Sequence, residues 1–262
     1  KDPFKAIKDF SERKIELRWL NPEHREQYIK YRDDCLSYIK NKNFDNYYKI
    51  TKKPIDQRRW EYLMKRKAWY IMPLGWDIIT KVGGNIADFG CGDGDTVQRL
   101  IDYIEKECKI KNIQNKKYHI IGLDLNASRI ENAKKYVKSN NPNITFEFHV
   151  ADISGKGVMY DDNYFNFGII TGVIEYIEDS ILDYFLDEIC RTVSKGIYFH
   201  GSCEKFPGCT PRNNIDEILS KREFKVKNKH KIFSEPFDID RLQDPMKIWP
   251  IILNQNVWAE RN

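Results

Sequence analysis

The sequence predicts an α/β protein built on a doubly wound, mostly parallel sheet of seven strands. Two observations support this fold class. Short apolar runs alternate with amphipathic stretches from residue 85 to residue 200, a pattern typical of parallel strands joined by helices. Two further apolar runs near the C-terminus have no full helix between them, which predicts an antiparallel strand pair.

The chain is expected to divide into an N-terminal helical extension, residues 1–83, and an α/β core, residues 84–262. Residues before 84 are rich in charged and aromatic side chains and lack the strand–helix alternation. The cap, proline and acid of Asn21-Pro22-Glu23 are a helix start, and Pro73-Leu74-Gly75 is a helix break. The extension is therefore expected to hold helices from Asn21 to about Lys40, from about Pro54 to the break, and over Trp76–Lys81.

Within the core, the apolar runs predict strands and the amphipathic stretches predict helices. Strands are expected at Asn85–Phe89, Tyr118–Asp124, Ile144–Val150, Tyr164–Ile170, Gly196–His200, Phe224–Phe233 and Lys247–Trp258. Helices are expected at Thr96–Lys106, Ala127–Lys138 and Ser180–Val193.

Composition excludes several classes of protein. The 262 residues are 41% hydrophobic and 32% charged, which is enough apolar material for a folded core. No apolar run approaches the roughly 20 residues of a membrane-spanning helix, and the first ten residues lack the apolar stretch of a secretory signal. The six cysteines form no C-x-x-C pair, so we expect reduced thiols, a cytoplasmic protein and no metal site. A net charge of +5 permits binding to nucleic acid without requiring it.

The strongest chemical signal is the segment Ile86-Ala87-Asp88-Phe89-Gly90-Cys91-Gly92-Asp93-Gly94. It places an acid at the end of a buried strand, then three glycines at alternate positions, then a helix. Glycines let the backbone approach a ligand closely, and a helix N-terminus presents unpaired N–H groups. A dinucleotide-binding turn would read G-x-G-x-x-G, with an acid about 20 residues later. The spacing therefore disfavours a nicotinamide-dependent dehydrogenase.

This segment resembles the first motif of the class I S-adenosylmethionine-dependent methyltransferases, and three more motifs follow in that family's order. Gly122-Leu123-Asp124-Leu125-Asn126 resembles the second motif, Val150-Ala151-Asp152-Ile153 the third, and residues 164–178 the fourth. The resemblance covers residues 84–262 and implies an enzyme that uses S-adenosylmethionine and releases S-adenosylhomocysteine. The residues that it implies at the cofactor are Asp88, Gly90, Cys91, Gly92, Asp124, Leu125, Asp152, Ile153 and Thr171.

The resemblance also implies a role for each acid. Asp124 would bind the ribose hydroxyls, and Asp152 would contact the adenine amino group. Asp88 would hydrogen-bond the glycine turn and hold it near the methionine part of the cofactor. Structural alternatives are that Asp124 caps the following helix and that Asp152 is an ordinary loop acid.

The acceptor side of the predicted site carries fewer signals. Many small-molecule members of the family end the fourth motif in Leu-Glu-His, whereas this chain has Ile174-Glu175-Tyr176. Thr171-Gly172-Val173-Ile174 has no proline, which argues against the base and amide chemistry of members with a proline motif there. Tyr176 is expected to position the acceptor. His200 is a candidate general base, although a strand-end histidine bonded to the backbone is the favoured interpretation. Metal or soft-substrate binding by His200, Cys203 and Cys209 is a weaker alternative.

The two ends of the chain carry further expectations. In this family, N-terminal helices fold over the cleft and select the acceptor, so the extension is expected to be a lid, with Tyr70 in contact with the cofactor or acceptor. The alternative is that the aromatic residues of the extension only pack its helices onto the core. Lys225, Lys227, Lys229 and Lys231 alternate and are expected on one face of their strand. The resemblance places that strand at the sheet edge, where lysines block pairing with other chains; we favour this over a polyanion-binding face.

We therefore expect a cytoplasmic methyltransferase that acts on a small molecule and binds no membrane or nucleic acid. An amine or sulfur acceptor is favoured because these nucleophiles need no strong protein base and respond mainly to positioning. One rival is an RNA or protein methyltransferase, suggested by the basic charge balance. The other is a non-catalytic cofactor-binding subunit, against which the intact motifs argue.

Overall fold

The computed structural model describes Ser37, Trp60 and residues 73–113, 115–154, 157–203, 210, 212–233 and 253–262. The helices are α5 (Trp76–Val82), α6 (Asp95–Lys111), α7 (Ala127–Tyr136), α8 (Asp179–Thr192) and α9 (Ile215–Ser220), with a short 3-10 helix, η2 (Ile174–Tyr176). The strands are β1 (Gly84–Phe89), β2 (Tyr118–Asp124), β3 (Ile144–Val150), β4 (Phe165–Thr171), β5 (Val193–Ser202), β6 (Phe224–Phe233) and β7 (Leu253–Arg261).

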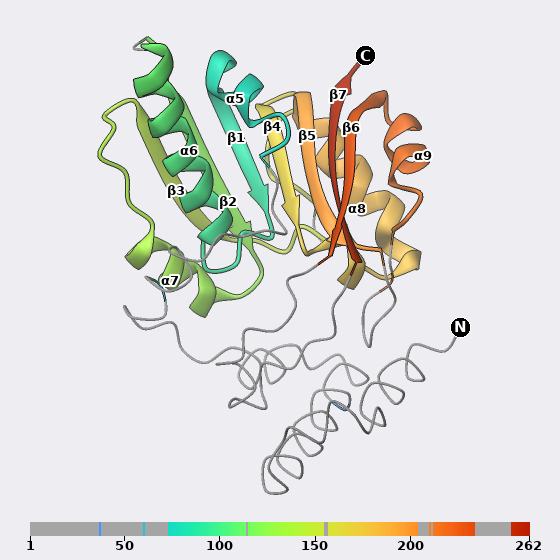
Figure 1. The fold of residues 1–262 in the computed structure, drawn as a ribbon. Helices are drawn as coiled ribbons and strands as arrows, with labels where there is room; N and C mark the ends of the chain where they lie inside the picture. Colours follow the sequence, from blue (N-terminus) through green and yellow to red (C-terminus); the bar gives the residue numbers. More distant parts are fainter. Residues whose placement is uncertain are drawn as a thin grey trace, which may run out of the picture.

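All seven strands form one mixed sheet in the order β3-β2-β1-β4-β5-β7-β6 (Figure 1). Strands β1 to β5 pair in parallel, and β7 runs antiparallel to both of its neighbours, β5 and β6. The predicted fold class, including the antiparallel C-terminal pair, is therefore confirmed. The strand order reverses between β1 and β4, and such a switch point is where open α/β sheets bind ligands.

Helices cover both faces of the sheet, which explains why the central strands are apolar along their whole length. One layer packs α5, α6 and α7 on side chains such as Ile86 and Tyr198. The other packs α8 and α9 on side chains such as Phe89 and Phe199. Strand β3 lies at one edge of the sheet and alternates between buried and exposed residues.

Trp258 joins α5 to the antiparallel end of the sheet. It is fully buried on β7, and two glycines leave room for its indole ring. A Cβ atom added to Gly75 would lie 2.1 Å from that ring, and one added to Gly196 would lie 2.6 Å from it. Trp76, at the start of α5, belongs to the same apolar cluster.

The structure departs from the sequence-based expectation in two elements. Helix α9 was not expected, because its six residues give too few turns for a clear period. In β6, Val226 pairs with Ala259 and Asn228 with Trp258, so Lys227 is an extra residue in a bulge. The bulge reverses the alternation and sends Lys229 and Lys231 to the opposite face from Lys225. The expectation that the four lysines share one face is wrong, whereas the edge position of β6 is confirmed.

No helix in the described part of the chain is long and apolar enough to cross a membrane.

Candidate cofactor and acceptor site

The candidate site lies where the parallel strands β1, β2, β4 and β5 end. Because these strands run in one direction, their C-terminal residues meet at one edge of the sheet. Asp88, Asp124, Thr171 and His200 are all within two residues of a strand end there. The topology therefore brings the acids of the first two motifs beside the fourth motif.

The turn after β1 is built from glycines in the left-handed backbone region. Gly90, Gly92 and Gly94 have φ angles of 83°, 56° and 85°, a region that side-chain-bearing residues rarely adopt. A Cβ on Gly90 would lie 2.2 Å from Val173, and one on Gly92 would lie 1.9 Å from the Arg129 guanidinium. The turn is thus closely surrounded and leads directly into the N-terminus of α6.

Asp124 ties this turn to the end of β2. Its Oδ2 accepts a hydrogen bond from the Gly92 backbone N–H at 2.8 Å, and its Oδ1 accepts one from the Asn126 N–H at 2.8 Å. Arg129 lies 3.8 Å from Oδ2. The cap of α7 is Asn126, whose Oδ1 accepts from the Ser128 and Arg129 backbone N–H groups. The helix-cap alternative for Asp124 is therefore wrong.

Asp88 is a buried carboxylate without a hydrogen-bond donor among the described residues. Its side chain is almost fully buried, and neither oxygen has a partner, so the hydrogen bond expected to the turn is absent. Burial raises its pKa well above the ordinary value; the charges of Asp95 and Asp124 raise it further, and that of Arg129 lowers it. A buried, unpartnered carboxylate creates a site for a donor or a cation.

The remaining residues implied at the cofactor differ in exposure. Asp152 accepts hydrogen bonds from the backbone N–H and hydroxyl of Ser154, and Ile153 is buried in the core. Leu125 follows Asp124 and is 63% exposed, so it offers an uncovered apolar surface at this edge. Burial, then the charge of Asp88, raises the pKa of the Cys91 thiol, which is therefore neutral.

The fourth motif includes β4 and continues past its end, next to the switch point between β1 and β4. The Thr171 hydroxyl is buried and has no hydrogen-bond partner among the described residues. The Gly172 N–H donates to the His200 carbonyl at 3.0 Å, which joins the ends of β4 and β5. Tyr176 is half-buried in η2, and its backbone N–H donates to the Val173 carbonyl.

His200 is held by a side chain on the neighbouring strand β7. Its Nδ1 lies 3.2 Å from Oδ1 of Asn256, which also accepts the Tyr198 hydroxyl at 2.6 Å. Since an amide oxygen only accepts, the His200 proton is on Nδ1 and the ring lone pair is on Nε2. Burial lowers the pKa of His200 to about 4, against the opposing effect of the Asn256 hydrogen bond. The imidazole is therefore neutral at neutral pH.

Two functional candidates, Arg129 and Glu175, were not predicted from the sequence. Arg129 forms an ion pair with Asp93 at 3.3 Å as well as its contact with Asp124. Its position in the first turn of a helix that follows a cofactor motif was the available signal. Glu175 is buried beside the ends of β4 and β5, and no local pattern predicts burial of a glutamate in a loop.

Tyr70 and Cys209 lie outside the described residues, and Cys203 is half-buried. Within the described ranges, no group of His, Cys, Asp or Glu side chains could hold a metal ion.

The residues present fit S-adenosylmethionine. The half-buried Gly90 puts no side chain between the turn and a ligand, Asp88 offers a buried carboxyl group without a partner among the described residues, and each oxygen of Asp124 has one backbone N–H donor and room to accept another bond. S-adenosylmethionine has an ammonium and a sulfonium group that suit a carboxylate, and ribose hydroxyl groups that can donate hydrogen bonds to Asp124.

Comparison with known proteins also indicates a methyltransferase. The sequence pattern of the methyltransferase domain family matches residues 80–243. Magnesium protoporphyrin IX methyltransferase from Synechocystis PCC 6803, solved with bound SAH (S-adenosylhomocysteine), is 12% identical, with a TM-score of 0.53 over 86% of this chain and 97% of that one. A Pyrococcus horikoshii OT3 protein is 16% identical, with a TM-score of 0.54 over 83% and 99% of the two chains.

A third similar structure comes from work on the conversion of a disulfide bond into a thioacetal group during echinomycin biosynthesis. It is 16% identical, with a TM-score of 0.52 over 84% of this chain and 92% of that one. No curated protein matches the chain in sequence. The family match spans more than half of the chain, and the fold and motifs agree with it. The chain therefore belongs to the methyltransferase domain family and is a class I, S-adenosylmethionine-dependent methyltransferase.

Proposed function

We propose that this methyltransferase acts on a small molecule with an amine or sulfur acceptor. The observation that carries the proposed cofactor site is the unpaired, buried Asp88 beside a glycine turn that Asp124 closes. When bound, the cofactor would supply a methyl group on a sulfonium, which is a strong electrophile. The work of the protein is then to bind, orient and exclude water.

Each residue has a proposed part in binding. Asp124 would accept hydrogen bonds from the ribose hydroxyls on the lone pairs that its two backbone donors leave available. Asp88 would receive the cationic methionine end beside Gly90 and Gly92. Leu125, Cys91 and Ile153 would provide apolar surface near the base, with Asp152 as the polar contact. Thr171 would border the methyl end through its buried hydroxyl.

The N-terminal extension is proposed to complete the site as a lid, with Tyr70 at the cofactor or acceptor and Tyr176 opposite it. Trp60, the described residue of the second expected helix, stacks on Tyr136 of α7 with ring centroids 5.5 Å apart. This contact supports attachment of the extension to the core. Because α7 begins three residues after Asp124, it also supports a position of the extension close to the proposed cofactor site.

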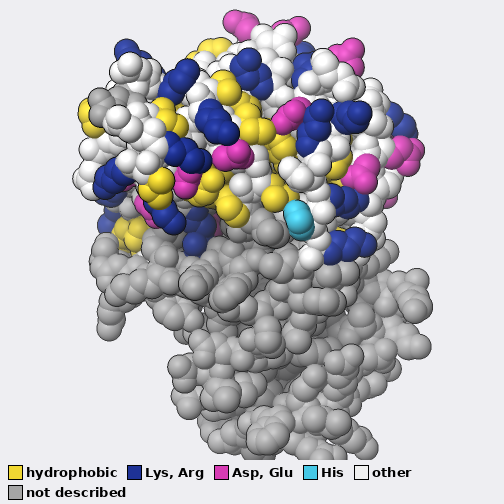
Figure 2. Space-filling model, turned by 45° about the horizontal axis from the view of Figure 1, so that its top comes forward, with side chains coloured by type: hydrophobic (Ala, Val, Ile, Leu, Met, Phe, Trp, Pro, Cys, Tyr) yellow, Lys and Arg dark blue, Asp and Glu magenta, His cyan; other side chains and the backbone are white. Residues whose placement is uncertain are grey.

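Two observations favour a small molecule over RNA. The segment that follows β4 has no proline motif. The face in Figure 2 has Lys and Arg side chains interspersed with Asp and Glu rather than a continuous basic patch. Binding to a nucleic-acid backbone depends on clustered basic side chains.

The test is transfer of isotopically labelled methyl from S-adenosylmethionine to three separate pools: a size-filtered metabolite extract, RNA and total protein. We expect label in the metabolite pool, with the product identified by mass. Label confined to RNA or protein would overturn the proposed acceptor class. Binding of S-adenosylhomocysteine without transfer to any pool would instead favour the non-catalytic subunit.

A further inference from the structure

Glu175 is a buried carboxylate in the fourth motif, at the acceptor side of the site, and the sequence analysis gave it no role. It lies in η2, four residues after Thr171, and its side chain is 6% exposed. A Cβ built on Gly201 would lie 3.3 Å from its Oε2, and one on Gly172 would lie 4.0 Å from its Oε1. The carboxylate therefore lies between the ends of β4 and β5.

The carboxylate is only partly satisfied. Oε2 is buried and has no hydrogen-bond partner among the described residues. Burial raises the pKa of Glu175 to about 7; backbone hydrogen bonds from Glu175 itself and Ser202 lower it, as does the charge of Arg212. The Arg212 guanidinium also donates hydrogen bonds to Asp179 and the Ile177 carbonyl. Its charge is therefore shared between Asp179 and Glu175. The neighbouring strand end carries His200, which is neutral.

Few of the described residues lie on the Gly172 side of this carboxylate. Gly172 is exposed and has a φ of 64°. The nearest atom to a Cβ built on it is Oε1 of Glu175, and among the described residues, chain neighbours aside, no other heavy atom lies within 4 Å. A group that approaches the end of β4 would meet the exposed Gly172 and then this carboxylate.

We propose that Glu175 is the proton acceptor of the reaction and that the methyl acceptor is an amine that enters as its ammonium ion. The inference rests on the proposed small-molecule function and selects nitrogen over sulfur. An aliphatic amine has a pKa near 10, so only about one molecule in a thousand is neutral at pH 7. The sequence-based expectation considered an amine that needs no strong base, whereas an amine that arrives protonated needs a proton acceptor. A buried, half-satisfied carboxylate attracts the ammonium as well.

The proton and electron balance is simple. One N–H bond of the ammonium breaks and an O–H bond forms on Glu175, which leaves a lone pair on nitrogen. That lone pair forms the new N–C bond to the methyl group as the S–C bond breaks, with its electron pair remaining on sulfur. The product is a methylated ammonium ion, and Glu175 returns its proton to water.

The first experiment needs no substrate. Protein with ¹³C-labelled glutamate carboxyl groups is titrated by NMR, and the Glu175 signal is assigned as the one that Glu175→Gln removes. We expect its midpoint near pH 7, while the exposed Glu178, assigned through Glu178→Gln, provides the comparison within the same segment. A Glu175 midpoint near that of an ordinary glutamate would overturn the proposal.

The second experiment identifies the nucleophilic atom. The metabolite extract is treated before the labelled transfer, one portion with an amine-acylating reagent and another with a thiol-alkylating reagent. We expect acylation to abolish transfer and alkylation to leave it unchanged. The reverse result would overturn the amine while the small-molecule function stands, whereas label only in RNA or protein would overturn that function itself.

The variants then test the role of the carboxylate with the identified product. Glu175→Gln should lower kcat/KM roughly 10²–10⁴-fold, as expected for loss of a proton acceptor, and should abolish the pH dependence near pH 7. Its affinity for S-adenosylhomocysteine should match that of the wild type. His200→Ala should cost less than about tenfold, because a base with a pKa far below neutrality is a weak proton acceptor. A large loss in His200→Ala and little in Glu175→Gln would overturn the assignment.

Discussion

His200 and Glu175 have opposite pKa shifts for the same physical reason. Burial disfavours the charged form of each group, so it lowers the pKa of His200 to about 4 and raises that of Glu175 to about 7. His200 lies near the end of β5, and Glu175 lies in η2, which follows the end of β4. At neutral pH the histidine is therefore uncharged, and the glutamate is present in both its protonated and its ionised form.

These shifts predict opposing contributions to stability. Between about pH 4 and 6.5 the unfolded state binds more protons at His200, so that residue makes the free energy of unfolding rise with pH. Between about pH 4.5 and 7 the folded state binds more protons at Glu175, so that residue makes the free energy of unfolding fall as the pH rises.

Glu175→Gln removes only the falling contribution. Between pH 4.5 and 6.5 its free energy of unfolding should therefore rise relative to wild type by up to about 1.4 kcal/mol per pH unit. Urea denaturation of both proteins at several pH values measures the difference, with Glu178→Gln as the control. Parallel profiles for wild type and Glu175→Gln would contradict the assigned shift of Glu175.

The sequence was informative for residues whose roles follow from local chemistry. Gly90, Gly92 and Asp124 were recognised because a strand end, a glycine turn and a helix start are adjacent in the chain. Glu175 was not, because its unusual property depends on burial by segments distant in sequence, such as Gly201 and Arg212. The prediction that Asp88 hydrogen-bonds the glycine turn was wrong for a similar reason, since tertiary packing decides where a strand-end side chain points.

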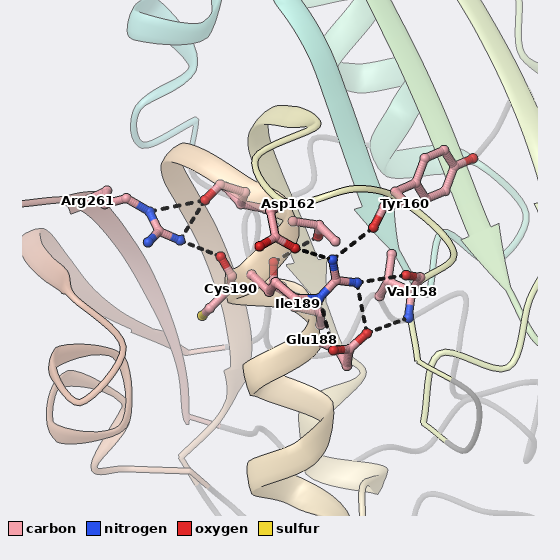
Figure 3. A network of polar contacts seen from close by, with 10 residues as sticks. Val158, Tyr160, Asp162, Glu188, Ile189, Cys190 and Arg261 are labelled. Carbon is pink, nitrogen blue, oxygen red and sulfur yellow. Dashed lines mark hydrogen bonds and ion pairs between the residues drawn. The ribbon is translucent and has the colours of Figure 1, made fainter.

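Arg191, at the end of α8, anchors the connection between β3 and β4. Its guanidinium donates to the carbonyls of Val158 and Tyr160 and to the carboxylates of Asp162 and Glu188. Figure 3 shows these acceptors converging from the loop and the helix. Glu188 also accepts the Val158 backbone N–H at 3.2 Å, so the loop and helix are joined in both directions.

Arg191→Met should destabilise the protein by about 2–3 kcal/mol, because it removes the donor to the Tyr160 carbonyl and the charged partner of the partly buried Glu188, and leaves the Val158 carbonyl only the Tyr160 N–H. Arg191→Lys should recover only part of this loss, since an ammonium cannot reproduce the planar fork. Urea denaturation at neutral pH gives both values. Wild-type stability in Arg191→Met would show that this network does not fix the loop.

The element-level differences also have a physical basis. Helix α9 is six residues long, and its stability comes from packing Ile215, Ile218 and Leu219 in the core rather than from its own period. The Lys227 bulge keeps Val226 partly buried and brings Lys229 within 3.1 Å of Asp216 on α9. An alternating pattern along one strand does not report such a register change.

At the scale of the whole molecule, the order of the motifs predicted the architecture because each motif is tied to a strand end. Parallel pairing then places those ends at one edge, and the strand order reverses between β1 and β4, where open α/β sheets bind ligands. The fold could therefore be anticipated, together with the edge of the sheet at which we propose that the cofactor binds. The acceptor side could not, since it depends on contacts between β4, β5, β7 and η2 that no local pattern encodes.

We propose that the edge formed by the glycine turn and Asp124 binds the cofactor, and calorimetric titration with S-adenosylhomocysteine tests this proposal most directly. Each charge-assisted hydrogen bond to a ribose hydroxyl contributes about 1.5–3 kcal/mol, so Asp124→Ala should weaken binding roughly tenfold to 150-fold for each bond lost. Asp161→Ala, an exposed acid before the start of β4, should bind like the wild type. Wild-type affinity in a folded Asp124→Ala variant would contradict the claim.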